Sequence, residues 1–119
     1  MTETFGTFGE SLAMDFLQSL GYEILARGYH ARYGEIDLIA KDGACLVFVE
    51  VKTRKSAYFA EAREAVSPSK RRKLRQTAEM YLMASDTDLP ARFDVIEVYA
   101  PQGIRTEKPE IIHLEDAFQ

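Results

Sequence analysis

Two acidic residues and a lysine stand at a spacing that can support metal-dependent hydrolysis of a phosphodiester bond. Asp37 lies in the mostly apolar segment 35–40, and Glu50 and Lys52 lie two residues apart in the valine-rich segment 45–53. Carboxylate oxygens suit a hard cation such as Mg²⁺ or Mn²⁺, which keeps several waters and shares its shell with phosphate. Lys52 would then lie beside a metal-bound water or the scissile phosphate. These three residues form the candidate catalytic group, and the cation is the candidate cofactor.

A predicted β-hairpin places these side chains on one face of a sheet. Asp42 and Gly43 form a strong two-residue turn signal, and a turn on them makes Asp37 a diagonal neighbour of Glu50. Because side chains alternate along a strand, two sets separate. One face carries Glu35, Asp37, Phe48, Glu50 and Lys52, and the other carries Ile36, Leu38, Val47, Val49 and Val51. A divalent cation would offset the repulsion and lost hydration of clustered acids. The alternative is a solvated, charged sheet face that binds no ligand.

The remaining sequence predicts a mixed α/β protein. Thr7 to Glu10 has the form of a capping box, and apolar residues at helical spacing predict a helix over about 8–20. Ser67 followed by Pro68 predicts the start of a second helix that runs to about residue 84. Strands are predicted at 22–31, 34–40, 45–53, 92–99 and 110–114, with a loop at 54–66. The order α-β-β-β-α-β-β predicts a single domain over 1–119, in which helices flank a mixed central sheet.

Composition excludes several classes of protein. Hydrophobic residues make up 46% of the 119-residue chain and charged residues 29%, values near the average for globular proteins. The longest wholly apolar run, 44–49, is far shorter than the roughly 20 residues of a membrane-spanning helix. The single cysteine excludes an internal disulfide and a cysteine-based zinc site. The first residues lack the basic and apolar stretches of a secretory signal. We therefore expect a small cytoplasmic protein with no membrane partner.

Basic residues concentrate in one segment although the net charge is −4. Residues 51–75 hold nine basic side chains against two acidic ones. The basic side chains are Lys52, Arg54, Lys55, Arg63, Lys70, Arg71, Arg72, Lys73 and Arg75. A face with such a concentration of charge can bind phosphates even in an acidic protein. The candidate nucleic-acid-binding residues are Lys55, Lys70, Arg71, Lys73 and Arg75. The alternative is a solvated helix surface.

The candidate catalytic residues also match a known pattern. Asp37 followed by Glu50-Val51-Lys52 resembles the bipartite Asp…(Asp/Glu)-x-Lys motif of the restriction-endonuclease-like nuclease superfamily, although Ile36 stands where the general motif has proline. Nearly the whole chain resembles a bacterial family of small predicted endonucleases, distantly similar to archaeal Holliday-junction resolvases. The matching segments are Gly9-Glu10 with Ala13, Gly34-Glu35-Ile36-Asp37-Leu38-Ile39-Ala40, Val47-Phe48-Val49-Glu50-Val51-Lys52-Thr53-Arg54 and Arg92-Phe93-Asp94-Val95.

The resemblance implies a restriction-endonuclease-like αβββαβ core with a defined set of site residues. Asp37 and Glu50 would be metal ligands and Lys52 the catalytic lysine. Glu10 corresponds to an additional acidic residue of the resolvase-like branch, and Gln76 to a polar position on the second helix. The residues themselves leave alternatives open: Glu10 can be the glutamate of the capping box, Gln76 an exposed helix residue, and Glu35 either a further ligand or a solvated acid at the strand end.

The implied function is that of a metal-dependent endodeoxyribonuclease, with roles in DNA repair and recombination. Its partner would be structured or branched DNA, and its resolvase relatives make a homodimer an expectation. No small-molecule cofactor is expected beyond the cation. Two alternatives stay open: a non-catalytic nucleic-acid-binding or complex-assembly protein on a nuclease fold, and RNA as the substrate.

Overall fold

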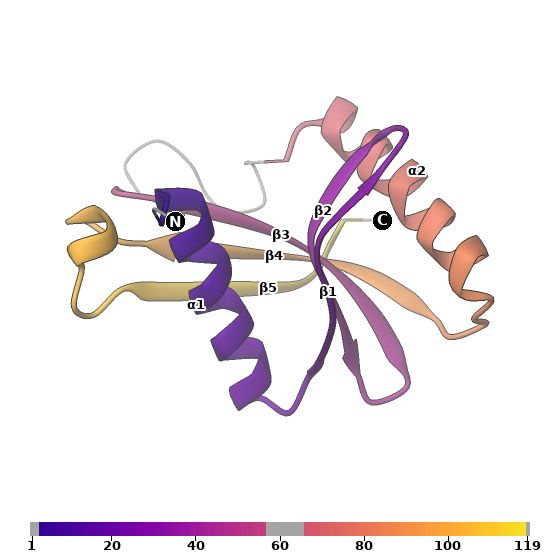
Figure 1. Ribbon diagram of the computed structural model, residues 1–119, viewed down its shortest axis with the longest axis horizontal. Coiled ribbons are helices and arrows are strands. Elements are labelled where there is room, and N and C mark those ends of the chain that lie inside the picture. The colour runs from indigo at the N-terminus through magenta and orange to yellow at the C-terminus, as the bar shows by residue number, and fades with distance from the viewer. Residues whose placement is uncertain (1–2, 57–65, 119) are drawn as a thin grey trace.

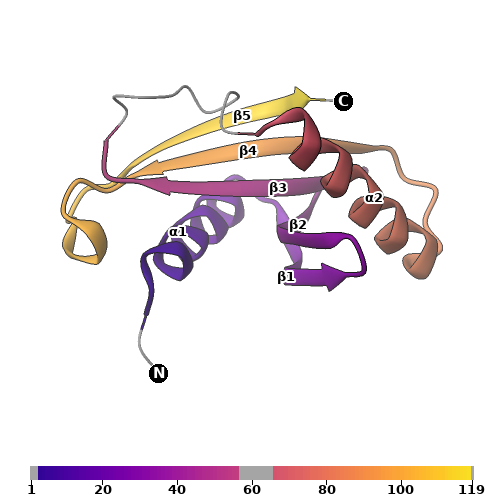
Figure 2. The same cartoon turned by 90° about the horizontal axis from the view of Figure 1, so that it is seen from above.

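A five-stranded mixed sheet carries one helix on each face (Figures 1 and 2). The computed structural model describes residues 3–56 and 66–118. The helices are α1, Phe5–Ser19, and α2, Pro68–Ser85, with a short 3-10 helix, η2, at Gly103–Arg105. The strands are β1, Glu23–Ala31; β2, Gly34–Asp42; β3, Cys45–Arg54; β4, Ala91–Tyr99; and β5, Glu110–Phe118. The strands lie in chain order, and among the described residues β3 and β4 pair in parallel while the other neighbouring strands pair antiparallel.

The predicted order of elements and the αβββαβ-type core are confirmed. The parallel pairing of β3 with β4 requires a crossover connection, and α2 lies in that crossover. Residues 57–65, which contain Arg63 and most of the predicted loop, lie outside the described part of the chain. Within the described part, neither helix is long and apolar enough to span a membrane.

Helix α1 begins earlier than predicted, and its cap is a different pair of residues. Thr4 is the N-cap: its hydroxyl accepts the Thr7 backbone N–H at 3.0 Å, and the Thr7 hydroxyl accepts the Thr4 backbone N–H at 2.9 Å. Two amide groups at the helix start are satisfied in this way. The predicted capping box of Thr7 and Glu10 is therefore wrong, and Glu10 lies inside the helix.

The hairpin between β2 and β3 turns on Gly43 and Ala44 rather than on Asp42 and Gly43, so Asp42 pairs with Cys45. Gly43 adopts a φ of +58°, whereas a turn on Asp42 and Gly43 of the predicted type would require Asp42 to leave the strand conformation as well. The register shifts by two residues. Because side chains alternate with a period of two, this shift preserves the predicted faces of most of the hairpin.

Two hydrophobic clusters lie on opposite faces of the sheet. Under α1, Ala13 and Leu17 pack on Leu38, Ala40, Val47, Val49, Val51, Ile96 and Val98. Under α2, Leu74 and Ala78 pack on Ile36, Ile39, Phe48 and Val95. Ile36 was predicted to lie with Leu38, and this placement is wrong. The N-terminal part of β2, before Leu38, leaves β3 and twists toward α2, as Figure 1 shows, and carries Ile36 into the second cluster.

A buried acid of β4, Asp94, serves the fold. Its carboxylate is bonded to Arg92 Nε at 3.0 Å, to His113 Nε2 at 2.7 Å and to the Asp116 backbone N–H at 2.9 Å. Burial opposes ionisation, but the contacts with His113, Arg92 and Asp116 outweigh it and hold the pKa of Asp94 below its usual value. The segment Arg92–Val95 thus contributes a network that joins β4 to β5.

Gly9 permits α1 to approach β3 closely. A Cβ atom placed on Gly9 would lie 1.8 Å from Thr53 Oγ1 and 2.9 Å from Thr53 Cβ. Rotation of the threonine side chain can remove the first clash but not the second. The close approach brings the next residue, Glu10, to the sheet near Asp37.

We predict that Gly9→Ala lowers the free energy of unfolding by about 1–3 kcal/mol, because α1 must move away from β3. Gly6→Ala is the matched control: Gly6 lies in the same helix, is exposed, and its added Cβ would meet only Thr4 Oγ1 at 3.9 Å. That variant should be as stable as the wild type or more stable by up to about 1 kcal/mol. Urea unfolding of both variants measures the difference, and equal stability would contradict the close contact.

Candidate metal centre

The site forms where β2 and β3 separate. Their backbone pairing runs from Asp42–Cys45 to Leu38–Val49. At the next position the Asp37 carboxylate accepts the Val51 backbone N–H at 2.8 Å. A side chain of β2 thus makes the bond to β3 at the point of separation, and a cavity of about 160 Å³ lies beside it.

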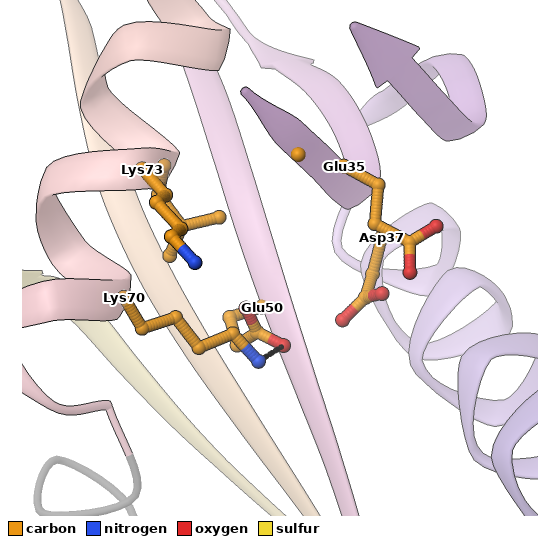
Figure 3. A pocket seen from close by; sticks show the side chains of 7 residues that line it. Glu35, Asp37, Glu50, Lys70 and Lys73 are labelled. Carbon is orange, nitrogen blue, oxygen red and sulfur yellow. Dashed lines mark hydrogen bonds and ion pairs between the residues drawn. The ribbon is translucent and has the colours of Figure 1, made fainter. Parts of the chain in front are cut away.

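Three carboxylates and two lysines line this cavity (Figure 3). The lining residues are Gly34, Glu35, Asp37, Glu50, Lys70, Lys73 and Leu74. Asp37 comes from β2, Glu50 from β3, and both lysines from α2, whose first turns extend over this part of the sheet. The structure therefore brings Asp37 and Glu50 together in one cavity, on the α2 side of the sheet.

Glu50 is only 6% exposed, and its Oε1 atom lies 3.1 Å from Lys70 Nζ. Burial and the neighbouring Asp37 carboxylate raise the pKa of Glu50 to about 7, and the attraction of Lys70 offsets only part of this rise. An acid whose charge is unfavourable and only partly compensated is a common feature of functional sites. The site therefore favours the arrival of further positive charge.

Lys52 and Lys70 meet beside Glu50. Burial and a hydrogen bond with Lys70 lower the pKa of Lys52, against the attraction of Glu50 and Asp37. Burial also opposes the charge of Lys70, but its bond with Glu50 dominates and raises the pKa of Lys70. Lys52 belongs to this charged group but is not among the residues that line the cavity.

Two further acids approach the group from its sides. Glu10 comes from α1. Its burial and, next in size, the nearby Asp37 charge raise its pKa. Its carboxylate lies 3.5 Å from Arg27 Nε. Glu35 lines the cavity, is exposed, and lies 3.3 Å from His30 Nε2. Both acids are thus neighbours of the Asp37–Glu50 pair, and each already has a basic partner.

The donor set fits Mg²⁺ or Mn²⁺. Over residues 3–56 and 66–118, no group of three or more acidic, histidine or cysteine side chains converges as a complete protein cage for a metal. Mg²⁺ does not need one, because it typically binds through one or two carboxylates and completes its shell with water and substrate phosphates. Asp37 and Glu50 would supply two such carboxylates, and the cavity lysines would attract an anionic ligand.

The other predicted site residues do not line this cavity. Gln76 is half-buried on α2 and does not line the cavity. Arg71 donates from Nε to the Val66 carbonyl at 2.9 Å, and its guanidinium lies over the Phe118 ring. Arg75 lines a different pocket, against Phe48, Ala78, Glu79, Leu82, Ala91 and Phe93. Lys55 lies over the Phe5 ring at the start of α1. Of the basic residues predicted to bind nucleic acid, only Lys70 and Lys73 line the cavity.

The sequence did not predict the ion pair between Lys70 and Glu50. Lys70 belongs to a run of four basic residues, Lys70 to Lys73, whose members the sequence does not distinguish. The one available signal is the predicted helix start at Ser67 and Pro68, which fixes the turn on which Lys70 lies. The contact of that turn with β3 depends on how α2 packs across the sheet.

Comparison with known proteins gives relatives along the full chain. Residues 9–98 match the sequence profile of the uncharacterised protein family UPF0102. A UPF0102 protein of Geotalea daltonii is 44% identical over 117 residues, which cover 98% of this chain and 90% of the relative. One of Caldicellulosiruptor saccharolyticus is 41% identical and covers 95% of each chain. One of Syntrophomonas wolfei is 40% identical and covers 99% of this chain and 100% of the relative.

The raised pKa of Glu50 makes stability depend on pH. The folded protein retains a proton that the unfolded chain releases between pH 4.5 and about 7, so the free energy of unfolding falls as pH rises through this window. In a chelator, this fall should be about 3 kcal/mol smaller for Glu50→Gln than for the wild type. Urea unfolding at pH 5 and pH 8 measures it. Glu79→Gln, at an exposed acid of α2, should follow the wild type; identical pH dependence in all three proteins would contradict the prediction.

Proposed function

We propose that this chain, which belongs to the uncharacterised protein family UPF0102, is a metal-dependent endonuclease of the restriction-endonuclease-like superfamily. Its substrate would be structured or branched DNA. The observation that carries the proposal is the pair of carboxylates, Asp37 and Glu50, in one cavity between two strands and a lysine-bearing helix. The resemblance of the segments around these residues to predicted endonucleases supports it, and so do the basic side chains beside them.

Each residue has a role that follows from its place. Asp37 and Glu50 would hold the cation. When bound, the cation would supply positive charge beside the phosphate oxygens and lower the pKa of a water molecule that it binds. Lys52 is close to both carboxylates and carries a lowered pKa. Its ammonium would orient the attacking water and stabilise charge that develops on the phosphate oxygens. Lys73, at the cavity wall, would bind a phosphate next to the scissile one.

The test of the proposal is cleavage of defined nucleic acids. Junction, flap, single-stranded and duplex DNA, with an RNA control, are incubated with the protein in Mg²⁺, in Mn²⁺ and in a chelator. We expect cation-dependent cleavage that is strongest on junction or flap DNA. Cleavage of RNA but not of DNA would show that RNA, rather than DNA, is the substrate. Binding of DNA without cleavage under every condition would favour a non-catalytic nucleic-acid-binding protein.

Loss of either carboxylate should weaken metal binding and cleavage. We predict that Asp37→Asn and Glu50→Gln each weaken Mn²⁺ binding at least tenfold, roughly the effect of one lost ligand, and reduce cleavage by orders of magnitude. Calorimetric titration with Mn²⁺ alone measures the first effect and single-turnover cleavage the second. Glu79→Gln is the control for the loss of an acid of α2 outside the cavity. A double variant of Asp37 and Glu50 with wild-type affinity would place the cation elsewhere.

Lys52 should contribute to the rate of cleavage rather than to the affinity for DNA. We predict that Lys52→Ala lowers the single-turnover cleavage rate by about 100-fold or more, with little change in DNA affinity, because its ammonium is one of many basic groups but lies beside the carboxylate pair. Lys52→Arg should not restore the rate, since a planar guanidinium cannot replace a compact ammonium. Lys41→Ala removes the same charge from the end of β2 and is the control. Normal cleavage by Lys52→Ala would show that the lysine is structural.

A further inference from the structure

Lys70 occupies the position beside the Glu50 carboxylate that a bound cation would need. Its Nζ atom lies 3.1 Å from Glu50 Oε1, and its side chain is 41% exposed while that of Glu50 is 7% exposed. A carboxylate that is nearly removed from water requires a positive partner, because an unpaired buried charge is costly. In the structure this partner is an ammonium group on a flexible, partly exposed stem.

A divalent cation and Lys70 therefore compete for the same carboxylate. With Asp37 and Glu50 on one side and Lys52 and Lys70 on the other, the four formal charges balance without any ion. A bound Mg²⁺ adds two positive charges next to two ammonium groups, which is unfavourable at close range. The balance is restored if one ammonium moves away and a phosphate enters the cavity.

Lys70 is the ammonium that can move. It is on α2, on the cavity side, three residues before Lys73, and side chains three apart on a helix are neighbours. Released from Glu50, its flexible stem can turn toward Lys73, where the two ammonium groups would share one phosphate. Lys52 comes from β3 and does not line the cavity.

We propose that Lys70 holds the place of the cation on Glu50 and transfers to a substrate phosphate when the cation binds. Metal and nucleic acid then bind cooperatively: the cation frees Lys70 for the phosphate, and the phosphate draws Lys70 away from the metal ligand. Because this coupling is favourable and reciprocal, each ligand binds more weakly alone than in the presence of the other. This inference rests on the proposed function for the identity of the site, and it assigns to Lys70 a positioning role through Glu50.

The first test uses Mn²⁺ alone, without nucleic acid and without an activity assay. Lys70→Met removes the competing ammonium, and its Mn²⁺ affinity should rise about tenfold above that of the wild type, within the usual range of site coupling. Lys70→Gln, a second variant, should show the same rise. Lys73→Met is the matched control: it removes an equal charge from the same cavity, where the described residues show no ion pair for Lys73, and should change the affinity less than threefold.

The second test measures binding of a synthetic DNA junction in a chelator. Glu50→Gln releases Lys70 and should tighten DNA binding severalfold. That gain should disappear when Lys70→Met is added, whereas a gain should persist when Lys73→Met is added instead. Such a double-mutant comparison isolates the 50–70 pair from the general loss of negative charge.

The outcomes separate this inference from the proposed function. If the wild type binds Mn²⁺ through Asp37, but Lys70→Met and Lys70→Gln bind it no more tightly, the metal site stands and the placeholder role of Lys70 is overturned. If neither the wild type nor these variants bind Mn²⁺, the metal centre fails, and both proposals fail with it. A rise in affinity of equal size for Lys70→Met and Lys73→Met would show a general charge effect and would also overturn the role of Lys70.

Discussion

The hydrogen bond from the Val51 backbone N–H to the Asp37 carboxylate determines the geometry of the whole site. It lies at the point where β2 stops pairing with β3. A buried N–H group must find an acceptor, and here a side chain supplies it. The carboxylate is thereby fixed at the separation of the two strands, beside Glu50. The N-terminal part of β2 can then turn toward α2, which opens the cavity while the Val51 amide keeps an acceptor.

Three acids of the described sheet are buried, and their surroundings differ. Asp94 receives donors from a histidine, an arginine and a backbone amide, and its pKa is held below the usual value. Glu97 is fully buried and forms an ion pair with Arg54. Glu50 is also buried, and this burial, together with the neighbouring Asp37 carboxylate, raises its pKa to about 7. Asp94 is thus well compensated and joins two strands of the sheet, whereas Glu50 remains poorly compensated and favours added positive charge.

The elements and their faces could be predicted because they depend on local patterns of period two and period 3.6. The register of the β2–β3 hairpin was wrong by two residues, yet an even shift preserves the face of Asp37 and Glu50. Predictions failed where a local signal had a competitor. Thr4 replaced Thr7 as the cap of α1, and the twist of β2 moved Ile36 to the other face. The contact of Lys70 with Glu50 spans twenty residues and depends on the packing of α2, which no local pattern encodes.

The partners of the four acids in and around the cavity show which of them can exchange ligands. Glu50 is paired with Lys70, Glu10 with Arg27, and Glu35 with His30, so each of these three carboxylates contacts a basic side chain that can move to an incoming anion. Among these acids, Asp37 is the one that accepts a hydrogen bond from the sheet backbone, which cannot move away. A cation can therefore attach first to Asp37 without breaking an ion pair. Every further carboxylate must give up its basic partner before it can bind the cation. A phosphate that accepts this partner lowers the cost of the exchange.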